Sequence, residues 1–221
     1  MIQQRFETYE ITNLFLRRFF DLQFRSLQSV IKQELKTVAG KKVLDFGSGS
    51  TLWGSYFAKR NSYYSLDPNS HANYKSLSEI PKNLKFDIIL LIEVLEHLEN
   101  PTLVLNELKD YLSAHGEIWI SVPFAARVHG CPKDYWRWTE DGLKILMKNS
   151  GFEIVALKSR GSDIHTLVAK FNFYIFKRLR YLFFLLPISI VLNFLLLMFD
   201  QLNLPLDKDD PLGYFFRAKI N

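Results

Sequence analysis

The residues at positions 43–50, Val-Leu-Asp-Phe-Gly-Ser-Gly-Ser, could place a carboxylate at the mouth of a ligand site. An apolar run of this kind is typical of a parallel strand that is buried on both faces of a sheet. The carboxyl end of such a strand opens onto the crevice where α/β sheets bind ligands. Gly47 and Gly49 allow backbone angles that other residues avoid, and they let the main chain approach a ligand closely. Asp45 would therefore bring negative charge to that crevice.

Two further acids follow apolar segments in the same way. Asp67 closes the β-rich segment 63–66, and Glu93 follows the apolar segment 86–92. Asp67 lies about twenty residues beyond the glycine turn, where an acid at the end of the second strand meets ribose hydroxyls in nucleotide-binding folds. The spacing therefore predicts a nucleotide-like ligand at one edge of a parallel sheet.

Together, the three segments resemble the cofactor site of class I S-adenosylmethionine-dependent methyltransferases. The resemblance implies that Asp45 and the glycine turn surround the methionine part of the cofactor. It also implies that Asp67 binds the ribose and that Glu93 ends the fourth strand beside the transferable methyl group. The implied cofactor-binding set is Asp45, Phe46, Gly47, Ser48, Gly49, Asp67 and Glu93. The sequence departs from the family at Thr51, where many members have a third glycine, and the adenine contacts cannot be assigned.

The pentapeptide 93–97, Glu-Val-Leu-Glu-His, offers a second kind of chemistry. If a helical turn follows the strand, Glu93, Glu96 and His97 could converge on one cation, and such ligands suit Mg²⁺ or Zn²⁺. The string resembles the metal-binding signature of small-RNA 3′-end methyltransferases and of some ubiquinone-pathway O-methyltransferases. It also occurs in methyltransferases without a metal, where Glu93 faces the cofactor and His97 helps to hold the next helix. We therefore assign no residue of this pentapeptide as a metal ligand. A metal-binding role for Glu93, Glu96 and His97 stays open as the alternative.

The segment 129–139, His-Gly-Cys-Pro-Lys-Asp-Tyr-Trp-Arg-Trp-Thr, is the predicted substrate site, because loops beyond strand ends commonly hold substrates. Aromatic rings such as Tyr135 could stack on a sugar, while Asp134 and Arg137 would fix its hydroxyl groups. The segment resembles a Pro-x-Asp-Tyr-aromatic-Arg-aromatic-Thr signature of bacterial methyltransferases, many of them associated with surface polysaccharide or glycolipid synthesis. His129 is the candidate catalytic base, because its ordinary pKa lies near neutrality.

The same segment also has a structural interpretation. In it the aromatic side chains are packing residues, and Thr139 is the N-cap of a helix that begins at Glu140. For Thr139 we favour the cap. For His129 and Asp134 both interpretations stay open.

The alternation of the remaining segments predicts an α/β fold. We expect a Rossmann-like, doubly wound sheet of seven strands, the last antiparallel, with an apolar helical insertion between the last two strands. One methyltransferase domain would cover residues 1–221, with an N-terminal helical segment at 1–40, the insertion at 161–209 and the final strand at 212–221. Helices are predicted at 11–38, from 101 to a stop at Gly116, and at 143–147; strands other than the first and last are predicted at 63–66, 74–80, 86–92, 117–122 and 152–157.

The insertion contains the most apolar part of the sequence. No charged residue occurs at positions 181–199, which is close to the ~20 residues that cross a bilayer as a helix. Basic residues lie just before it, as the positive-inside rule would require of a membrane anchor. A single crossing would, however, separate the last two strands, and Pro187 divides the run. We therefore expect two or more short helices that contact the membrane interface, their own domain or a second subunit.

Composition narrows the function classes only modestly. The net charge of +5 among 221 residues is mildly basic, and no basic stripe suggests nucleic acid. Cys131 is the single cysteine, so no internal disulfide can form. Residues 1–10 lack an apolar signal core, which predicts a cytoplasmic protein. The apolar segment 171–199 would bring that protein into contact with the inner face of the membrane.

The sequence therefore predicts a methyltransferase that uses S-adenosylmethionine and methylates a saccharide or glycolipid hydroxyl. A lipid or quinone O-methyltransferase is the alternative enzyme. A catalytically silent fold that serves as a membrane or complex partner is the alternative from another class. The expected partners are a small-molecule or lipid-linked sugar substrate, the membrane surface and a second copy of the chain, with no nucleic acid.

Overall fold

The computed structural model describes residues 19–49, 53–68, 71–130, 133–202 and 206–221. It divides into two compact units, which are taken one at a time below. One unit consists of residues 30–124, 128–158 and 214–221, and the other of residues 1–29, 125–127 and 159–213. Of the predicted N-terminal helix, residues 11–18 lie outside the described residues, as do Thr51 and Cys131.

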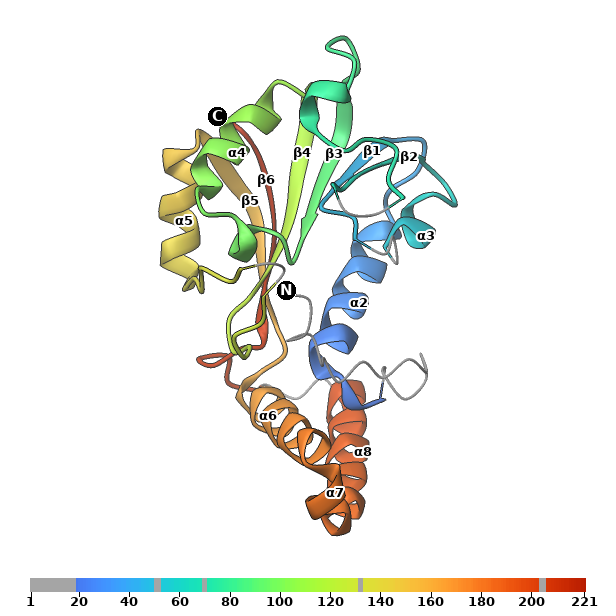
Figure 1. The fold of residues 1–221 in the computed structure, drawn as a ribbon, viewed down its shortest axis with the longest axis vertical. Helices are drawn as coiled ribbons and strands as arrows, with labels where there is room; N and C mark the ends of the chain where they lie inside the picture. The colour runs from blue at the N-terminus through green and yellow to red at the C-terminus, as the bar shows by residue number, and fades with distance from the viewer. Residues whose placement is uncertain (1–18, 50–52, 69–70, 131–132, 203–205) are drawn as a thin grey trace, which may run out of the picture. The chain divides into compact units, whose positions relative to one another are not determined.

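A six-stranded sheet is the framework of the fold, with the order β2-β1-β3-β4-β6-β5 (Figure 1). Its first four strands pair in parallel, and the last strands are antiparallel. The predicted doubly wound α/β fold with a helical insertion before the last strand is confirmed. The strands are β1 (Lys42–Phe46), β2 (Ser62–Leu66), β3 (Phe86–Ile92), β4 (Leu112–Pro123), β5 (Phe152–Arg160) and β6 (Gly213–Ile220).

The sheet has six strands, so the predicted seventh strand is wrong. The missing one is the third strand expected at 74–80. Only an isolated bridge between Leu66 and Tyr74 forms there, and a single 3-10 turn, η1 (Leu77–Glu79), follows. The physical reason is length, because the interval between Asp67 and Phe86 cannot hold both a crossover helix and a strand.

Helices flank the sheet, and side chains near their first turns cap two of them. They are α2 (Leu22–Leu35), α3 (Gly54–Phe57), η2 (Leu95–His97), α4 (Pro101–Lys109) and α5 (Glu140–Asn149). The Asn100 side chain accepts a hydrogen bond from the backbone N–H of Leu103 at the start of α4. Thr139 does the same for Gly142 at the start of α5, so the favoured cap interpretation of Thr139 is confirmed. These caps fix where the chain turns back from the strand ends.

The helix that begins at Pro101 ends earlier than its leucines suggested. It stops at Lys109, and β4 begins at Leu112, so Gly116 lies within a strand instead of ending a helix. The pairing of β3 with β4 shifts register between Phe86 and Ile88, which absorbs the extra residues of β4. Apolar side chains from β1, β3, β4, α4, α5 and β6 fill one core beneath this arrangement.

The second unit contains the helices of the insertion: α6 (Asp163–Lys177), α7 (Leu179–Leu182), η3 (Phe183–Leu185) and α8 (Leu186–Leu202). Pro187 lies in the first turn of α8, where its missing N–H costs no helical hydrogen bond. By length and composition, the helical stretch Phe183–Leu202 is long and apolar enough to cross a membrane, with a mean hydropathy of 2.2. The division of the chain into domains stays a prediction.

The helix pair α6 and α8 buries polar side chains together with apolar ones such as Val168 and Leu196, and the outer face of α8 is apolar. Ser189 and Asn193 of α8 are buried against α6. The Ser189 hydroxyl and the Asn193 amide donate hydrogen bonds to the Asn172 side-chain oxygen at 2.7 and 3.0 Å. The outer face of α8 exposes the apolar residues Ile188, Ile190, Val191, Phe194, Leu195, Met198, Phe199 and Leu202. So many exposed apolar residues are unusual for a helix that packs on a soluble core.

Candidate active site

The turn after β1 is fastened to the end of β2. Gly47 and Gly49 have φ angles of +76° and +51°, which side chains rarely adopt. The backbone N–H groups of Gly47 and Ser48 donate to the carbonyl oxygen of Leu66 at 2.8 and 3.2 Å. A Cβ atom at Gly47 would lie 2.7 Å from a methyl carbon of Val94, whereas one at Gly49 would meet no atom of the described residues within 4 Å. The turn is therefore closely packed on one side and open at Gly49.

Asp45 lies at the end of β1, where only 1% of its surface is exposed. Burial raises the pKa of its carboxyl from an ordinary value of 3.8 to about 6, partly offset by a hydrogen bond from Tyr63 and reinforced by the charge of Asp67. The Tyr63 hydroxyl donates this bond to Oδ2 at 2.6 Å. The Tyr63 ring covers Gly54, where an added Cβ would lie 2.6 Å from the ring. Gly54 thus leaves room for the ring whose hydroxyl holds Asp45.

The other two predicted acids also lie at strand ends. Oδ2 of Asp67 accepts a hydrogen bond from the backbone N–H of Gly49 at 2.9 Å, which joins β2 to the glycine turn. Glu93 is the one described non-glycine residue with positive φ, at +56°. Its Oε1 accepts a hydrogen bond from the Ser121 hydroxyl at 2.6 Å, and its N–H donates to the Ser121 carbonyl at 3.0 Å. Backbone strain of this kind is concentrated at functional sites.

Beyond Glu93, one carboxylate and two imidazoles converge from two loops. Glu96 is fully buried in η2. Its Oε1 lies 3.7 Å from Nε2 of His97 and 3.8 Å from Nε2 of His129. The two imidazole rings meet edge to face, with their centroids 5.0 Å apart. His129, the predicted base, is therefore held beside a buried acid that the sequence analysis left without a committed role.

The other nitrogen of each imidazole faces a hydrogen-bond acceptor. Nδ1 of His97 lies 2.6 Å from the carbonyl oxygen of Lys133. Nδ1 of His129 lies 3.4 Å from Oδ2 of Asp134, which also accepts from the His129 backbone N–H at 2.8 Å. Both guanidinium NH₂ groups of Arg137 donate to Asp134, at 2.6 and 2.7 Å. Asp134 thus links His129 to Arg137.

Charge and burial shift the pKa values in this loop. Burial lowers the pKa of His97, although the carbonyl of Lys133 opposes the shift. Burial alone would raise the pKa of Asp134, but the hydrogen bonds from Arg137 and from the backbone of His129 bring it below its ordinary value. The bond to Asp134 in turn raises the pKa of Arg137. Asp134 and Arg137 therefore form an ion pair at neutral pH.

The aromatic residues of the same loop divide between the two interpretations. Trp138 is buried in the core and stacks on Trp136, with centroids 6.0 Å apart. Tyr135 and Trp136 remain 38% and 41% exposed. Two hydrogen bonds hold these residues against the segment 96–98. The Tyr135 N–H donates to the Glu96 carbonyl and the Trp136 indole N–H to the Leu98 carbonyl, each at 2.8 Å. Trp138 is thus a packing residue, and the other two rings are available to a ligand.

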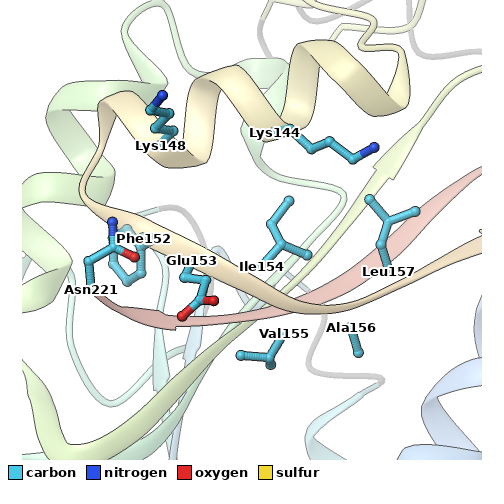
Figure 2. Close-up of a pocket in the computed structure, with 9 residues that line it drawn as sticks. All are labelled: Lys144, Lys148, Phe152, Glu153, Ile154, Val155, Ala156, Leu157 and Asn221. Atoms are coloured by element: carbon cyan, nitrogen blue, oxygen red, sulfur yellow. The ribbon is translucent and has the colours of Figure 1, made fainter.

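A separate hollow lies between α5 and β5 (Figure 2). Ile154 and Leu157 of β5 point toward α5 there, and Lys144 and Lys148 of α5 lie along its rim. None of the predicted site residues lines it. This hollow is therefore not the predicted cofactor or substrate site.

Sequence reasoning missed the hydroxyl groups that hold the acids. Tyr63 and Ser121 each bind a predicted cofactor residue, but both appeared only as ordinary residues of strands. The available signal was a polar side chain inside an otherwise apolar run, as at Ser121. Phe46 and Ser48 lie in the same turn, where Phe46 packs on the core and Ser48 is buried. The individual cofactor roles remain predictions.

The residues at this edge fit S-adenosylmethionine. Ser48 Oγ is a buried hydroxyl oxygen with no hydrogen-bond partner in the described part of the chain. Next to it lie the open side of Gly49 and the carboxylates of Asp45 and Asp67, which suit a ligand that carries a cation and a ribose. When bound, this cofactor supplies a methyl group on a positively charged sulfur. Asp45, Gly47, Ser48, Gly49 and Asp67 would hold it.

A parallel sheet with this turn and these acids at its carboxyl edge defines a class I S-adenosylmethionine-dependent methyltransferase. The model of the family described as "Methyltransferase domain" matches residues 19–157. The chain belongs to this family, and its cofactor is S-adenosylmethionine.

Known relatives agree with this assignment. The ubiquinone biosynthesis O-methyltransferase of Pasteurella multocida (strain Pm70) is 25% identical in an alignment of length 122 that covers 42% of this chain and 50% of that protein. The match thus spans half of that relative. One similar solved structure is the 1,6-didemethyltoxoflavin-N1-methyltransferase of Burkholderia thailandensis, with bound 1,6-didemethyltoxoflavin and S-adenosylhomocysteine. Its TM-score is 0.56 and its sequence identity 14%, and the match covers 94% of this chain and 85% of that one. A methyltransferase from Mesorhizobium loti has a TM-score of 0.54 and 12% identity, over 89% and 99%. The two structures support the fold.

Proposed function

We propose that the protein methylates a hydroxyl group of a saccharide or glycolipid. The observation that carries this proposal is the loop 133–139, where the exposed rings of Tyr135 and Trp136 lie beside the Asp134–Arg137 ion pair. Aromatic faces stack on sugar rings, and a fixed ion pair orients hydroxyl groups. The resemblance of this loop to methyltransferases of surface polysaccharide synthesis supports the same acceptor.

His129 is the group placed to take the proton of that hydroxyl. Asp134 faces its Nδ1, so Nε2 is the nitrogen left to accept a proton. The rings of Tyr135 and Trp136 would orient the acceptor. The protein thereby contributes alignment and deprotonation.

The helix pair α6–α8 supports a lipid-linked acceptor at the cytoplasmic face of the membrane. Buried polar side chains hydrogen-bond between its helices, and many apolar side chains of α8 are exposed, which is typical of helices that contact lipid. β5 and β6 precede and follow these helices and are neighbours in one sheet, so the chain must leave and return on one side of a membrane. Lys170, Lys177 and Arg178 give α6 the basic character that favours anionic headgroups. We therefore assign the pair to the membrane interface.

A lipid or quinone O-methyltransferase is the second candidate. The relative from Pasteurella multocida favours it, since that protein is a ubiquinone biosynthesis O-methyltransferase. The apolar face of α8 suits either acceptor, because both a glycolipid and a quinone carry an apolar tail. The two candidates therefore differ in the group that is methylated.

Transfer of a labelled methyl group distinguishes these acceptors. The full chain would be incubated with methyl-labelled S-adenosylmethionine and, in separate reactions, a polyprenyl-linked oligosaccharide, the same free oligosaccharide and a catechol-bearing quinol. Label in the two saccharides is expected. Trp136→Ala should lower kcat/KM for the saccharide about fivefold, since a stacking contact is worth about 1 kcal/mol, and leave cofactor affinity unchanged. Label in the quinol alone would replace the first candidate with the second.

Lipid binding can be measured by sedimentation with anionic phospholipid vesicles. Replacing Phe194 and Met198 together with serine should lower the partition coefficient at least about 100-fold, because each buried apolar side chain contributes about 1.5–3 kcal/mol. Ile145→Ser, at an exposed apolar position of α5, is the matched control and should leave partitioning unchanged. Equal partitioning of the double serine variant and the Ile145→Ser control would contradict the assignment of α6–α8 to the membrane interface. A dimer that the double substitution dissociates would instead give this face to a second copy of the chain.

A further inference from the structure

We propose that Glu96, His97 and His129 bind one divalent transition-metal cation, with Zn²⁺ the best fit. Each residue offers one ligand atom, and these three atoms lie within 4.8 Å of one another. They come from η2 and from the loop after β4. The set differs from the one suggested by the pentapeptide 93–97, because His129 is included and Glu93 is not.

The distances suit a cation better than direct hydrogen bonds. Oε1 of Glu96 lies 3.7 and 3.8 Å from the two Nε2 atoms, beyond the usual reach of a hydrogen bond of about 3.2 Å. Zinc binds imidazole nitrogen and carboxylate oxygen at about 2.0–2.2 Å, so its ligand atoms lie about 3.3–3.5 Å apart in a tetrahedron. The two Glu96–histidine distances would shorten by a few tenths of an ångström on binding, and the two imidazoles, whose ligand atoms lie within 4.8 Å, would move together by up to about 1.5 Å.

The hydrogen bonds behind the imidazoles fix which nitrogen faces Glu96. A carbonyl oxygen can only accept, so Nδ1 of His97 carries the proton that it donates to Lys133. Asp134 faces Nδ1 of His129 in the same way. In the neutral imidazoles, both unprotonated Nε2 atoms then lie 3.7–3.8 Å from the carboxylate of Glu96. A cation between the three atoms converts this repulsion into coordination.

The outer partners match those of known metal sites. A histidine that binds a metal almost always donates its second N–H to a carboxylate, a backbone carbonyl or water. His97 has the carbonyl of Lys133, and His129 has Asp134, which Arg137 holds by two hydrogen bonds. The burial of Glu96 adds to the argument, because a buried carboxylate is stabilised by a cation.

The ligand types indicate the metal and its use. Two imidazoles and one carboxylate leave a coordination position open, as in catalytic zinc sites. Glu93 is not among the residues whose ligand atoms converge, and its Oε1 accepts a hydrogen bond from the Ser121 hydroxyl. If the acceptor is a hydroxyl, as the proposed function has it, coordination at the open position would lower its pKa. His129 would then be a metal ligand, and the cation would replace it in activating the hydroxyl.

Metal binding can be tested without any acceptor. The full chain would be stripped with a chelator and titrated with Zn²⁺ by calorimetry, and with Co²⁺ for its visible absorption. We expect one equivalent of Zn²⁺ to bind with a micromolar or lower Kd. His97→Gln and His129→Gln should each weaken binding at least about 100-fold, since loss of a first ligand exceeds the 10–100-fold cost of losing an outer partner. His115→Gln, at an exposed histidine of β4, is the matched control.

The variants must be shown to fold, which circular dichroism and cofactor binding can establish. Absence of stoichiometric binding, or equal binding by the His97 and His129 variants and the His115 control, would overturn the proposal. Because the readout needs no substrate, one equivalent of Zn²⁺ in a protein that methylates no saccharide would support the site and reject only the proposed acceptor.

Discussion

Replacing Asp45 with asparagine is expected to stabilise the cofactor-free protein at about pH 8 by up to about 3 kcal/mol, because a pKa shift of about two units corresponds to that free energy. Burial raises the pKa of Asp45 from 3.8 to about 6 in the folded protein. Between these two values the folded state binds more protons than the unfolded state, so stability falls as the pH rises. Asparagine cannot ionise and avoids this loss.

The difference between the two proteins should depend on pH. It should be small near pH 4, grow between about pH 4 and pH 6, and remain constant above that range. Urea unfolding of both proteins across these conditions measures it. Asp141→Asn, at an exposed position of α5, is the control and should show no such growth. Parallel stability curves for Asp45→Asn and the wild type would contradict the prediction.

The stability lost at Asp45 has a functional interpretation. Stabilising substitutions at functional sites commonly lower activity, because such sites hold groups that suit the ligand rather than the empty fold. A cation on the cofactor would favour the ionised carboxylate, and the Tyr63 hydroxyl already orients it. The stabilised Asp45→Asn protein should therefore bind S-adenosylmethionine more weakly than the wild type.

Asp67→Ala is expected to weaken S-adenosylmethionine binding about 10- to 150-fold, because hydrogen bonds to a charged group contribute about 1.5–3 kcal/mol. The substitution removes the acid predicted to bind the ribose. It also removes the acceptor for the Gly49 N–H at 2.9 Å, so the glycine turn loses its attachment to β2. Calorimetric titration with S-adenosylmethionine and S-adenosylhomocysteine gives the two affinities.

Two variants separate these effects of Asp67. Asp67→Asn keeps an oxygen for Gly49 but loses the charge, so its affinity should lie between those of the wild type and Asp67→Ala. Asp87→Ala removes an acid from the opposite end of the sheet, near the start of β3, and should bind as the wild type does. An unchanged affinity in Asp67→Ala would show that Asp67 does not contribute to cofactor binding.

The sequence was most informative where one short segment determines both an element and its site. The apolar run 43–46 and its glycines predicted a strand and turn that the structure contains, as did 63–66 with Asp67 and 86–92 with Glu93. Local chemistry suffices in these places, because an apolar run predicts a buried strand and the positive φ angles of the turn after β1 favour glycine. The N-cap Thr139 was readable for the same reason.

Features that depend on packing between distant residues were not readable. The hydrogen bond from Tyr63 to Asp45 requires the open space above Gly54, which no spacing rule contains. Glu96 and His129 meet only because two loops fold toward each other. The composition of α8 showed that it is apolar, but its polarity pattern became visible only once Asn172 was seen to bind Ser189 and Asn193.

The position of β6 has a consequence for how the fold is assembled. β6 lies between β4 and β5, so β5 joins the rest of the sheet only through a strand that is made after it. During synthesis, β5 emerges from the ribosome first, the apolar helices follow, and the gap stays open until residues 213–220 appear. Until then the unpaired edges of β4 and β5 are exposed together with the apolar face of α8, a combination that favours aggregation. Membrane contact by α8 before β6 closes the sheet would protect the nascent chain.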